Sequence, residues 1–184
     1  TDAPDNLTVC SGDNAIFSVT ATGGDLSYEW RRNGVAVPGG TSATLNLAGV
    51  TPAMAGNYTV YISNTCGNVT SAAAVLVVNT VPAITTQPEA KTVCSGSNTS
   101  FSVVATGGNL TYQWRRNGVN VGSNSPTLNL TAVTPAMAGN YDVYISNNCG
   151  NVTSVTVAVT VNTTPAVTDA PDNLTVCSGD NAIF

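Results

Sequence analysis

The chain has 184 residues, of which 42% are hydrophobic and 8% are charged, and its formal net charge is −5. This composition provides enough apolar side chains for folding and excludes an intrinsically disordered chain. Ten acidic residues against five basic ones argue against a nucleic-acid-binding surface, and no apolar run is long enough to span a bilayer.

Short strand-like segments follow one another along the chain. Apolar and polar residues alternate over residues 15–22, 26–32, 44–47, 58–63 and 73–78. Glycine pairs and Asn-Gly dipeptides between these segments predict turns and a hairpin. No long segment has the 3.6-residue period of a helix. The pattern, about seven strands separated by turns, is typical of an antiparallel β-sandwich.

The pattern repeats along the chain. The segment Trp-Arg-Arg-Asn-Gly at residues 30–34 returns at residues 114–118, and residues 168–184 are identical to residues 1–17. Such a period predicts a tandem array of small domains, and we expect the chain to be a segment of a longer periodic polymer. The expected divisions are repeat 1 over 1–80 with its first strand truncated, repeat 2 over 81–163, and the opening strands of a third repeat, identical to repeat 1, over 164–184.

Three motifs in each repeat match strands that surround a sandwich core. In repeat 1 these are Tyr-x-Trp-Arg-Arg-Asn-Gly at 28–34, Leu-x-Leu at 45–47 and Ala-Gly-Asn-Tyr-x-Val at 55–60. They resemble strand C, strand E and the tyrosine corner of strand F in immunoglobulin-like domains, specifically the intermediate type found in tandem on bacterial surfaces. The resemblance implies an all-β, head-to-tail rod of immunoglobulin-like sandwiches. Its implied core residues are Trp30, Trp114, Tyr58, Tyr141, Val19, Val60, Val103 and Val143.

The cysteines depart from the pattern of this family. Val19 and Val60 stand where the family usually carries its inter-sheet disulfide. Cys10 precedes residues 12–19, which resemble strand B of the family, and Cys66 falls in residues 64–67, which resemble the hairpin between its strands F and G. A fixed pair of cysteines in each repeat is typical of an oxidising, extracellular setting, so we expect the protein to be secreted or at the cell surface.

The resemblance implies a disulfide between repeats. In that fold strands B and F run toward the same end of the sandwich, so Cys10 and Cys66 lie at opposite ends, too far apart to bond. Stacking the repeats head to tail then pairs Cys10 with Cys149 across a joint. The alternatives are five free thiols or a different pairing. The remaining cysteines are expected to pair with neighbouring repeats or chains: Cys66, Cys94 and Cys177.

Catalytic and metal-binding motifs are missing from the sequence. Without histidine there is no Ser-His-Asp or Cys-His arrangement, and the carboxylates form no paired motif. The cysteines lack the Cys-x-x-Cys spacing of a metal site. We therefore expect no enzymatic activity, no cofactor and no metal.

Two classes of function remain. The first is a structural segment of an extracellular filament or adhesin stalk, whose partners are copies of itself, joined by a continuous chain or by strand donation between chains. The second is an adhesion module that binds glycans or proteins through exposed side chains such as Tyr61 and Tyr144. Nearly identical hairpins around Cys66 and Cys149 favour the first class, since binding modules usually diversify their loops.

Overall fold

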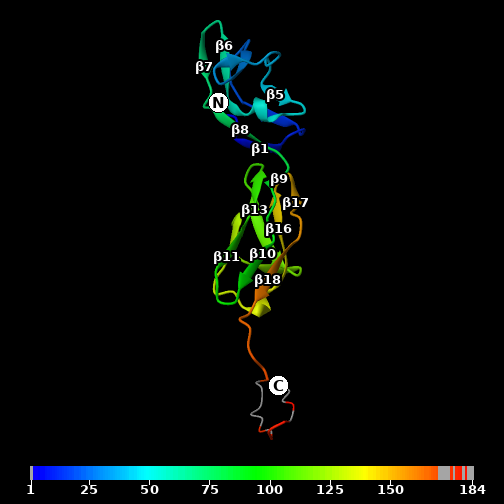
Figure 1. The fold of residues 1–184 in the computed structure, drawn as a ribbon. Helices are drawn as coiled ribbons and strands as arrows, with labels where there is room; N and C mark the ends of the chain where they lie inside the picture. The colour runs from blue at the N-terminus through cyan, green and yellow to red at the C-terminus, as the bar shows by residue number, and fades with distance from the viewer. Residues whose placement is uncertain (1, 170–174, 176, 180, 182–184) are drawn as a thin grey trace.

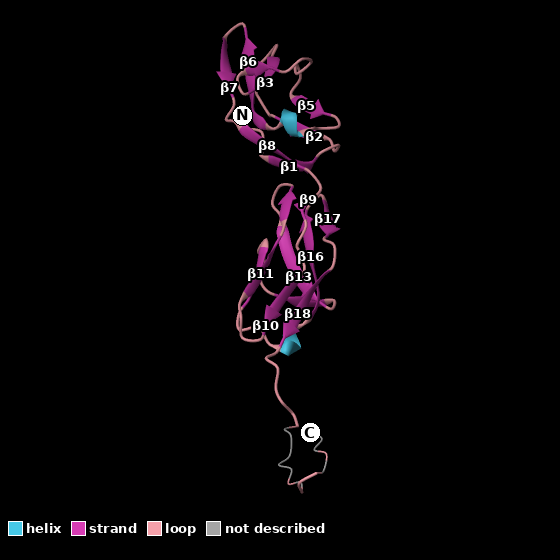
Figure 2. Ribbon diagram, in the orientation of Figure 1, coloured by secondary structure: helices cyan, strands magenta, loops and turns pink. Residues whose placement is uncertain are grey.

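Two β-sandwiches lie end to end along one axis (Figure 1). The computed structural model describes residues 2–169, 175, 177–179 and 181. Nearly all regular structure in these residues is strand; the exceptions are two single 3₁₀ turns, Pro52–Met54 and Pro135–Met137 (Figure 2). The predicted all-β fold of tandem sandwiches is confirmed.

The first sandwich packs a large sheet against a small one. The large sheet has the order β1-β8-β6-β3-β4, and β7 pairs with the C-terminal half of β6. The small sheet pairs β2 with β5. β1 runs parallel to β8, with Leu7 opposite Leu76. The strands are β1 (Leu7–Cys10), β2 (Ala15–Ser18), β3 (Ser27–Arg32), β4 (Val35–Ala36), β5 (Thr44–Leu47), β6 (Gly56–Asn64), β7 (Gly67–Thr70) and β8 (Ala74–Asn79).

The second sandwich repeats this plan and adds one strand pair. Its large sheet has the order β10-β18-β16-β13-β14 with β17 on β16; β11 pairs with β15, and β12 pairs with β9. The strands are β9 (Ala83–Thr86), β10 (Lys91–Cys94), β11 (Thr99–Ser102), β12 (Val104–Thr106), β13 (Thr111–Arg116), β14 (Val119–Val121), β15 (Thr127–Leu130), β16 (Gly139–Asn147), β17 (Gly150–Thr153) and β18 (Val157–Asn162).

Alternating side chains fill the space between the sheets of each sandwich. The Trp30 indole is fully buried, and its Nε1 donates a 2.9 Å hydrogen bond to the Ser42 carbonyl. The Phe17 ring stacks on Tyr58 with centroids 4.8 Å apart. All eight side chains named from the resemblance are at most 8% exposed: Val19, Trp30, Tyr58, Val60, Val103, Trp114, Tyr141 and Val143.

The tyrosine corner holds the turn before β6. The Tyr58 hydroxyl donates a 2.8 Å hydrogen bond to the Met54 carbonyl, and Arg32 Nη1 donates a 2.7 Å bond to the Ala53 carbonyl. Burial raises the pKa of the Tyr58 hydroxyl above its ordinary value of 10.0, and the charge of Arg32 acts in the opposite direction. The corner is therefore closed by side-chain hydrogen bonds to two backbone carbonyls.

The predicted third repeat lies partly outside the described residues. Of residues 164–184, the structure leaves 170–174, 176, 180 and 182–184 undescribed, and the described residues of this segment form no strand. Residues 163–169 extend away from the end of β18 (Figure 1).

Candidate functional site at the joint between the sandwiches

A disulfide crosses the joint between the two sandwiches. Cys10 and Cys149 are bonded, with Cα atoms 5.5 Å apart although 139 residues separate them in sequence. Cys10 ends β1 at the lower edge of the first sandwich. Cys149 lies in the hairpin between β16 and β17 at the upper end of the second. The bond therefore fastens the bottom of one sandwich to the top of the next.

Local hydrogen bonds hold each cysteine in place. Asn147 Oδ1 accepts a 2.8 Å bond from the Cys149 amide and so shapes the tip of its hairpin. On the other side of the joint, the Ser11 amide donates to the Asn79 carbonyl at 2.8 Å, which continues the parallel β1–β8 pairing one residue past Cys10. The two cysteines thus project from ordered backbone.

Asparagine side chains form the polar part of the joint. Asn79 Nδ2 donates a 3.0 Å hydrogen bond to Asn148 Oδ1. Asn147 Nδ2 donates to two carbonyls, 2.8 Å to Thr80 in the linker and 2.9 Å to Gly108. Asn79 is only 4% exposed. Since a buried amide is costly unless hydrogen-bonded, these contacts favour one relative position of the sandwiches.

Close approach at the joint also requires a glycine. A Cβ atom at Gly108 would overlap the side-chain oxygen of Asn79, whereas a Cβ at its counterpart Gly24 would have no heavy atom within 4 Å. The sequence pattern marked Gly23-Gly24 as a turn and did not reveal this role of Gly108. Gly108, unlike Gly24, lies against the other sandwich.

Cys66 and Cys94 lie in the same backbone settings as the bonded Cys149 and Cys10. The Cys66 amide donates to Asn64 Oδ1 at 2.9 Å, as Cys149 does to Asn147. Cys94 ends β10, and the following amide, that of Ser95, donates to the Asn162 carbonyl at 2.8 Å, as Ser11 does to Asn79. In the described residues the unbonded cysteines are all exposed: Cys66, Cys94 and Cys177.

The expectation of exposed tyrosines on the outer sheet face is wrong. Tyr61 and Tyr144 are half-buried, because an arginine guanidinium covers each ring. The Arg31 carbon Cζ lies 5.0 Å from the centroid of Tyr61, and Arg31 also pairs with Glu29 at 2.6 Å. In the second sandwich Arg115 lies 5.9 Å from the Tyr144 centroid. These ring faces are occupied by the protein's own side chains.

Other candidate sites were sought in the described part of the chain. It contains no cluster of three or more histidine, cysteine, aspartate or glutamate side chains suited to a metal ion. None of its helical segments has the length and hydropathy needed to cross a membrane.

Comparisons with known proteins match this architecture. The profile of the immunoglobulin domain family matches residues 81–147, and that of a PKD-like domain matches residues 2–77. The human protein "leucine-rich repeats and immunoglobulin-like domains protein 3" is 31% identical over 119 residues. That alignment covers 53% of this chain but only 11% of the human protein.

Solved structures with the same fold are also tandem arrays. An I-band fragment of titin superposes with a TM-score of 0.68 at 22% identity, over 88% of this chain and 64% of the fragment. Immunoglobulin domains 1–4 of Sidekick-1 superpose with a TM-score of 0.67 at 23% identity, over 87% of this chain and 47% of that one. The chain thus has the fold of immunoglobulin-like sandwiches in tandem.

Proposed function

We propose that this chain is a structural segment of an extracellular filament or adhesin stalk, built from immunoglobulin-like repeats that disulfides fasten at every joint. In this proposal residues 1–80 and 81–163 are the two repeats of the period, and residues 164–184 open a third. The role of the protein is to form a long, stiff extension from the cell, and its partners are copies of the same repeats. Catalysis has no part in it.

One observation carries the proposal. Cys66 and Cys94 occupy, at the two outer ends of the pair, the same backbone positions as the bonded Cys149 and Cys10. A second pair of sandwiches placed end to end with the first therefore brings a Cys66 against a Cys94. The joint inside the pair and the joint between pairs are then fastened alike.

A disulfide at the joint alters the mechanics of the array. Neighbouring domains joined only by a linker move relative to one another by default. The Cys10–Cys149 bond and the Thr80–Pro82 linker are two covalent connections between the same sandwiches, and together they restrict bending. Disulfides persist in oxidising compartments, which supports an extracellular or cell-surface location of the kind where bacterial surface arrays operate.

The alternative function is adhesion to glycans or proteins. Aromatic faces exposed on a sheet would favour it, but Arg31 and Arg115 cover those of Tyr61 and Tyr144. The structural function is therefore the better supported of the two.

Electron microscopy of the native material combined with denaturing gels tests the proposal. We expect thin fibres with an axial repeat of two sandwiches. On reducing gels a continuous polypeptide runs far above the 18.6 kDa of this chain, and strand-exchanged subunits run near that mass. Globular particles that do not form fibres under oxidising conditions would contradict the structural role.

A further inference from the structure

A hollow beside the tyrosine corner of the first sandwich combines an apolar wall with an arginine. Its volume is about 380 Å³, and small-molecule pockets span roughly 300–1,000 Å³. Arg32 lines it at the end of β3, and apolar side chains make up most of the wall: Val35, Val37, Pro38, Leu47 and Met54. We call this hollow the corner pocket.

Arg32 supplies the charge of the corner pocket. Its Nη1 donates a 2.7 Å hydrogen bond to the Ala53 carbonyl, which fixes the side chain at the corner. A guanidinium has further N–H donors in a planar fork that matches the oxygens of a carboxylate, so donors remain for a ligand. The Arg32 residue is half-buried, and charges attract more strongly there than on an open surface.

Arg32 also differs from most cations of the chain in having no carboxylate partner. Three of the five basic side chains form ion pairs: Arg31 with Glu29, Lys91 with Glu89, and Arg115 with Asp142. In the described residues Arg32 and Arg116 form none. The charge of Arg32 is therefore available to an anion from outside the chain.

The second sandwich has an arginine at the equivalent corner but a different wall beside it. Arg116 likewise donates to a backbone carbonyl, at 2.8 Å. In the strand register Asn120 replaces Ala36, and Gly122 follows the hairpin strand where Pro38 follows it in the first sandwich. An amide and a glycine thus replace two apolar side chains, so the second corner offers less apolar surface to a ligand.

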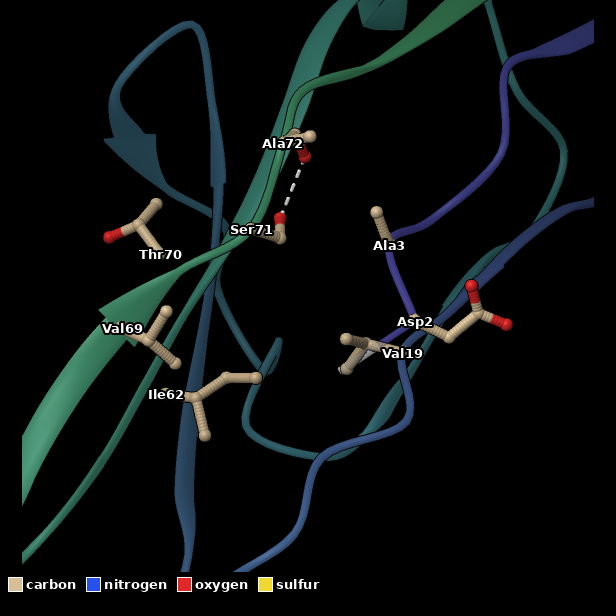
Figure 3. Close-up of a pocket in the computed structure, with 8 residues that line it drawn as sticks. All are labelled: Asp2, Ala3, Val19, Ile62, Val69, Thr70, Ser71 and Ala72. Carbon is tan, nitrogen blue, oxygen red and sulfur yellow. Dashed lines mark hydrogen bonds between the residues drawn. The ribbon is translucent and has the colours of Figure 1, made fainter.

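Another hollow of the first sandwich has the opposite charge. It measures about 260 Å³ and lies between the opening residues of the chain and β7 (Figure 3). Val19, Ile62 and Val69 form its apolar part, and Asp2 is the one ionic side chain among the residues that line it. Because a carboxylate at the rim repels an anion, this hollow provides a control within the same sandwich.

We propose that the corner pocket binds a small carboxylate that carries a short apolar chain. The carboxylate accepts charge-assisted hydrogen bonds from the Arg32 guanidinium, and the apolar chain packs against Val37, Leu47 and Met54. A phosphate or sulfate is less well suited, because one arginine supplies few donors for it and neither ion covers the apolar wall. The inference goes beyond the proposed function and is independent of it, since it needs neither a second copy nor a disulfide.

Hexanoate is the probe for this site. Acetate and 1-hexanol are its matched controls, because acetate has the charge without the chain and 1-hexanol has the chain without the charge. The protein is the full chain with its unbonded cysteines changed, so that copies do not cross-link: Cys66→Ser, Cys94→Ser and Cys177→Ser. The bond between Cys10 and Cys149 remains.

Amide chemical shifts measured by NMR locate the ligand and give its affinity. We expect hexanoate to shift the amides of Val35 and Val37 with a Kd on the order of 1 mM. Acetate and 1-hexanol should bind there at least about tenfold more weakly. The amides of Val69 and Thr70, beside the acidic hollow, should not move.

Val35→Asp tests the role of the arginine without removing it. Val35 is 72% exposed and stands opposite Arg32 in the strand register, so the new carboxylate pairs with Arg32 and leaves the core intact. Val119→Asp is the matched control, since Val119 is 69% exposed and stands opposite Arg116. Val35→Asp should weaken hexanoate binding at least about tenfold, and Val119→Asp should leave it unchanged.

Three results would each overturn the carboxylate site. They are no shift at Val35 and Val37 up to on the order of 10 mM hexanoate, 1-hexanol binding as tightly as hexanoate, and equal affinity for hexanoate in the two variants. None of them bears on the proposed function, which depends on fibres and on a bond between Cys66 and Cys94.

Discussion

The Asn79 side chain donates a 3.0 Å hydrogen bond to the side chain of Asn148, across the joint and beside the disulfide. Asn162, the counterpart of Asn79 at the free end of the second sandwich, is exposed. The same residue type is thus buried where a sandwich abuts it and exposed where none does. In the proposed array, the Cys66 hairpin of one copy and the Asn162 end of another form a second joint of this kind.

Replacement of Gly108 by alanine should open the joint inside the chain. The added Cβ overlaps the Asn79 side chain, so the sandwiches must separate or Asn79 must lose its bond to Asn148, at a cost of about 1–3 kcal/mol. NMR chemical shifts at Asn79 and Asn148 and the rate of Cys10–Cys149 reduction should both change. Gly24→Ala is the matched control, because nothing lies near that position within one chain; equal effects of the two changes would show that the joint is irrelevant.

Gly24→Ala should nevertheless prevent assembly. In a longer array Gly24 faces the Asn162 of another copy as Gly108 faces Asn79. The variant chain should therefore fold with wild-type stability and fail to form fibres. Normal fibres from this variant would contradict the equivalence of the two joints.

Cys149→Ser should make the pair of sandwiches flexible. Small-angle scattering should show a broader distribution of interdomain angles, since only the linker then restrains them. The cross-link closes a loop of 139 residues, so its loss should also lower the free energy of unfolding by up to about 5 kcal/mol in the chain-entropy account. Cys66→Ser provides the control and should alter neither quantity in the isolated chain.

Tyr58 should make stability depend on pH in the alkaline range. Its pKa is raised by burial above 10.0, so the unfolded chain releases this proton at a lower pH than the folded one. The contribution of the protonated Tyr58 hydroxyl to the free energy of unfolding is fully present below pH 10.0. It falls as the pH rises through the pKa of the folded state. Urea titrations from about pH 8 to about pH 12 should show that the free energy of unfolding falls less with rising pH in Tyr58→Phe than in the wild type. An identical loss would rule out Tyr58 as its source.

The sequence was sufficient to predict the sandwich fold because its signals are local. Alternating apolar residues and the corner around Tyr58 each depend on a few neighbouring positions, and β5 (Thr44–Leu47) has the predicted bounds. β1 was missed because Leu7–Cys10 does not alternate cleanly between buried and exposed side chains: Leu7, Val9 and Cys10 are all half-buried. Short edge strands such as β4 (Val35–Ala36) carry no pattern long enough to detect.

The joint was only partly predictable. The cysteine positions relative to strands B and F indicated which ends must meet. The roles of Asn79, Asn147 and Gly108 arise only when one sandwich lies against another, and no spacing within a repeat encodes that contact. Likewise, Tyr61 looked exposed because strand alternation cannot show that Arg31, on the neighbouring strand, folds over its ring.

The most direct test of an array with a disulfide at every joint is a tryptic map of the native material, made without reductant. Cleavage after arginine and lysine places Cys66 in peptide 33–91 and Cys94 in peptide 92–115. Cys10 lies in the peptide that ends at Arg31, and both Cys149 and Cys177 lie in the peptide that begins at Asn117. We predict that peptide 33–91 is cross-linked to 92–115, and that Cys10, in the peptide ending at Arg31, is bonded to Cys149, in the peptide beginning at Asn117. Recovery of the peptide ending at Arg31 joined to 33–91, or of Cys66 and Cys94 as free thiols, would contradict a disulfide at every joint.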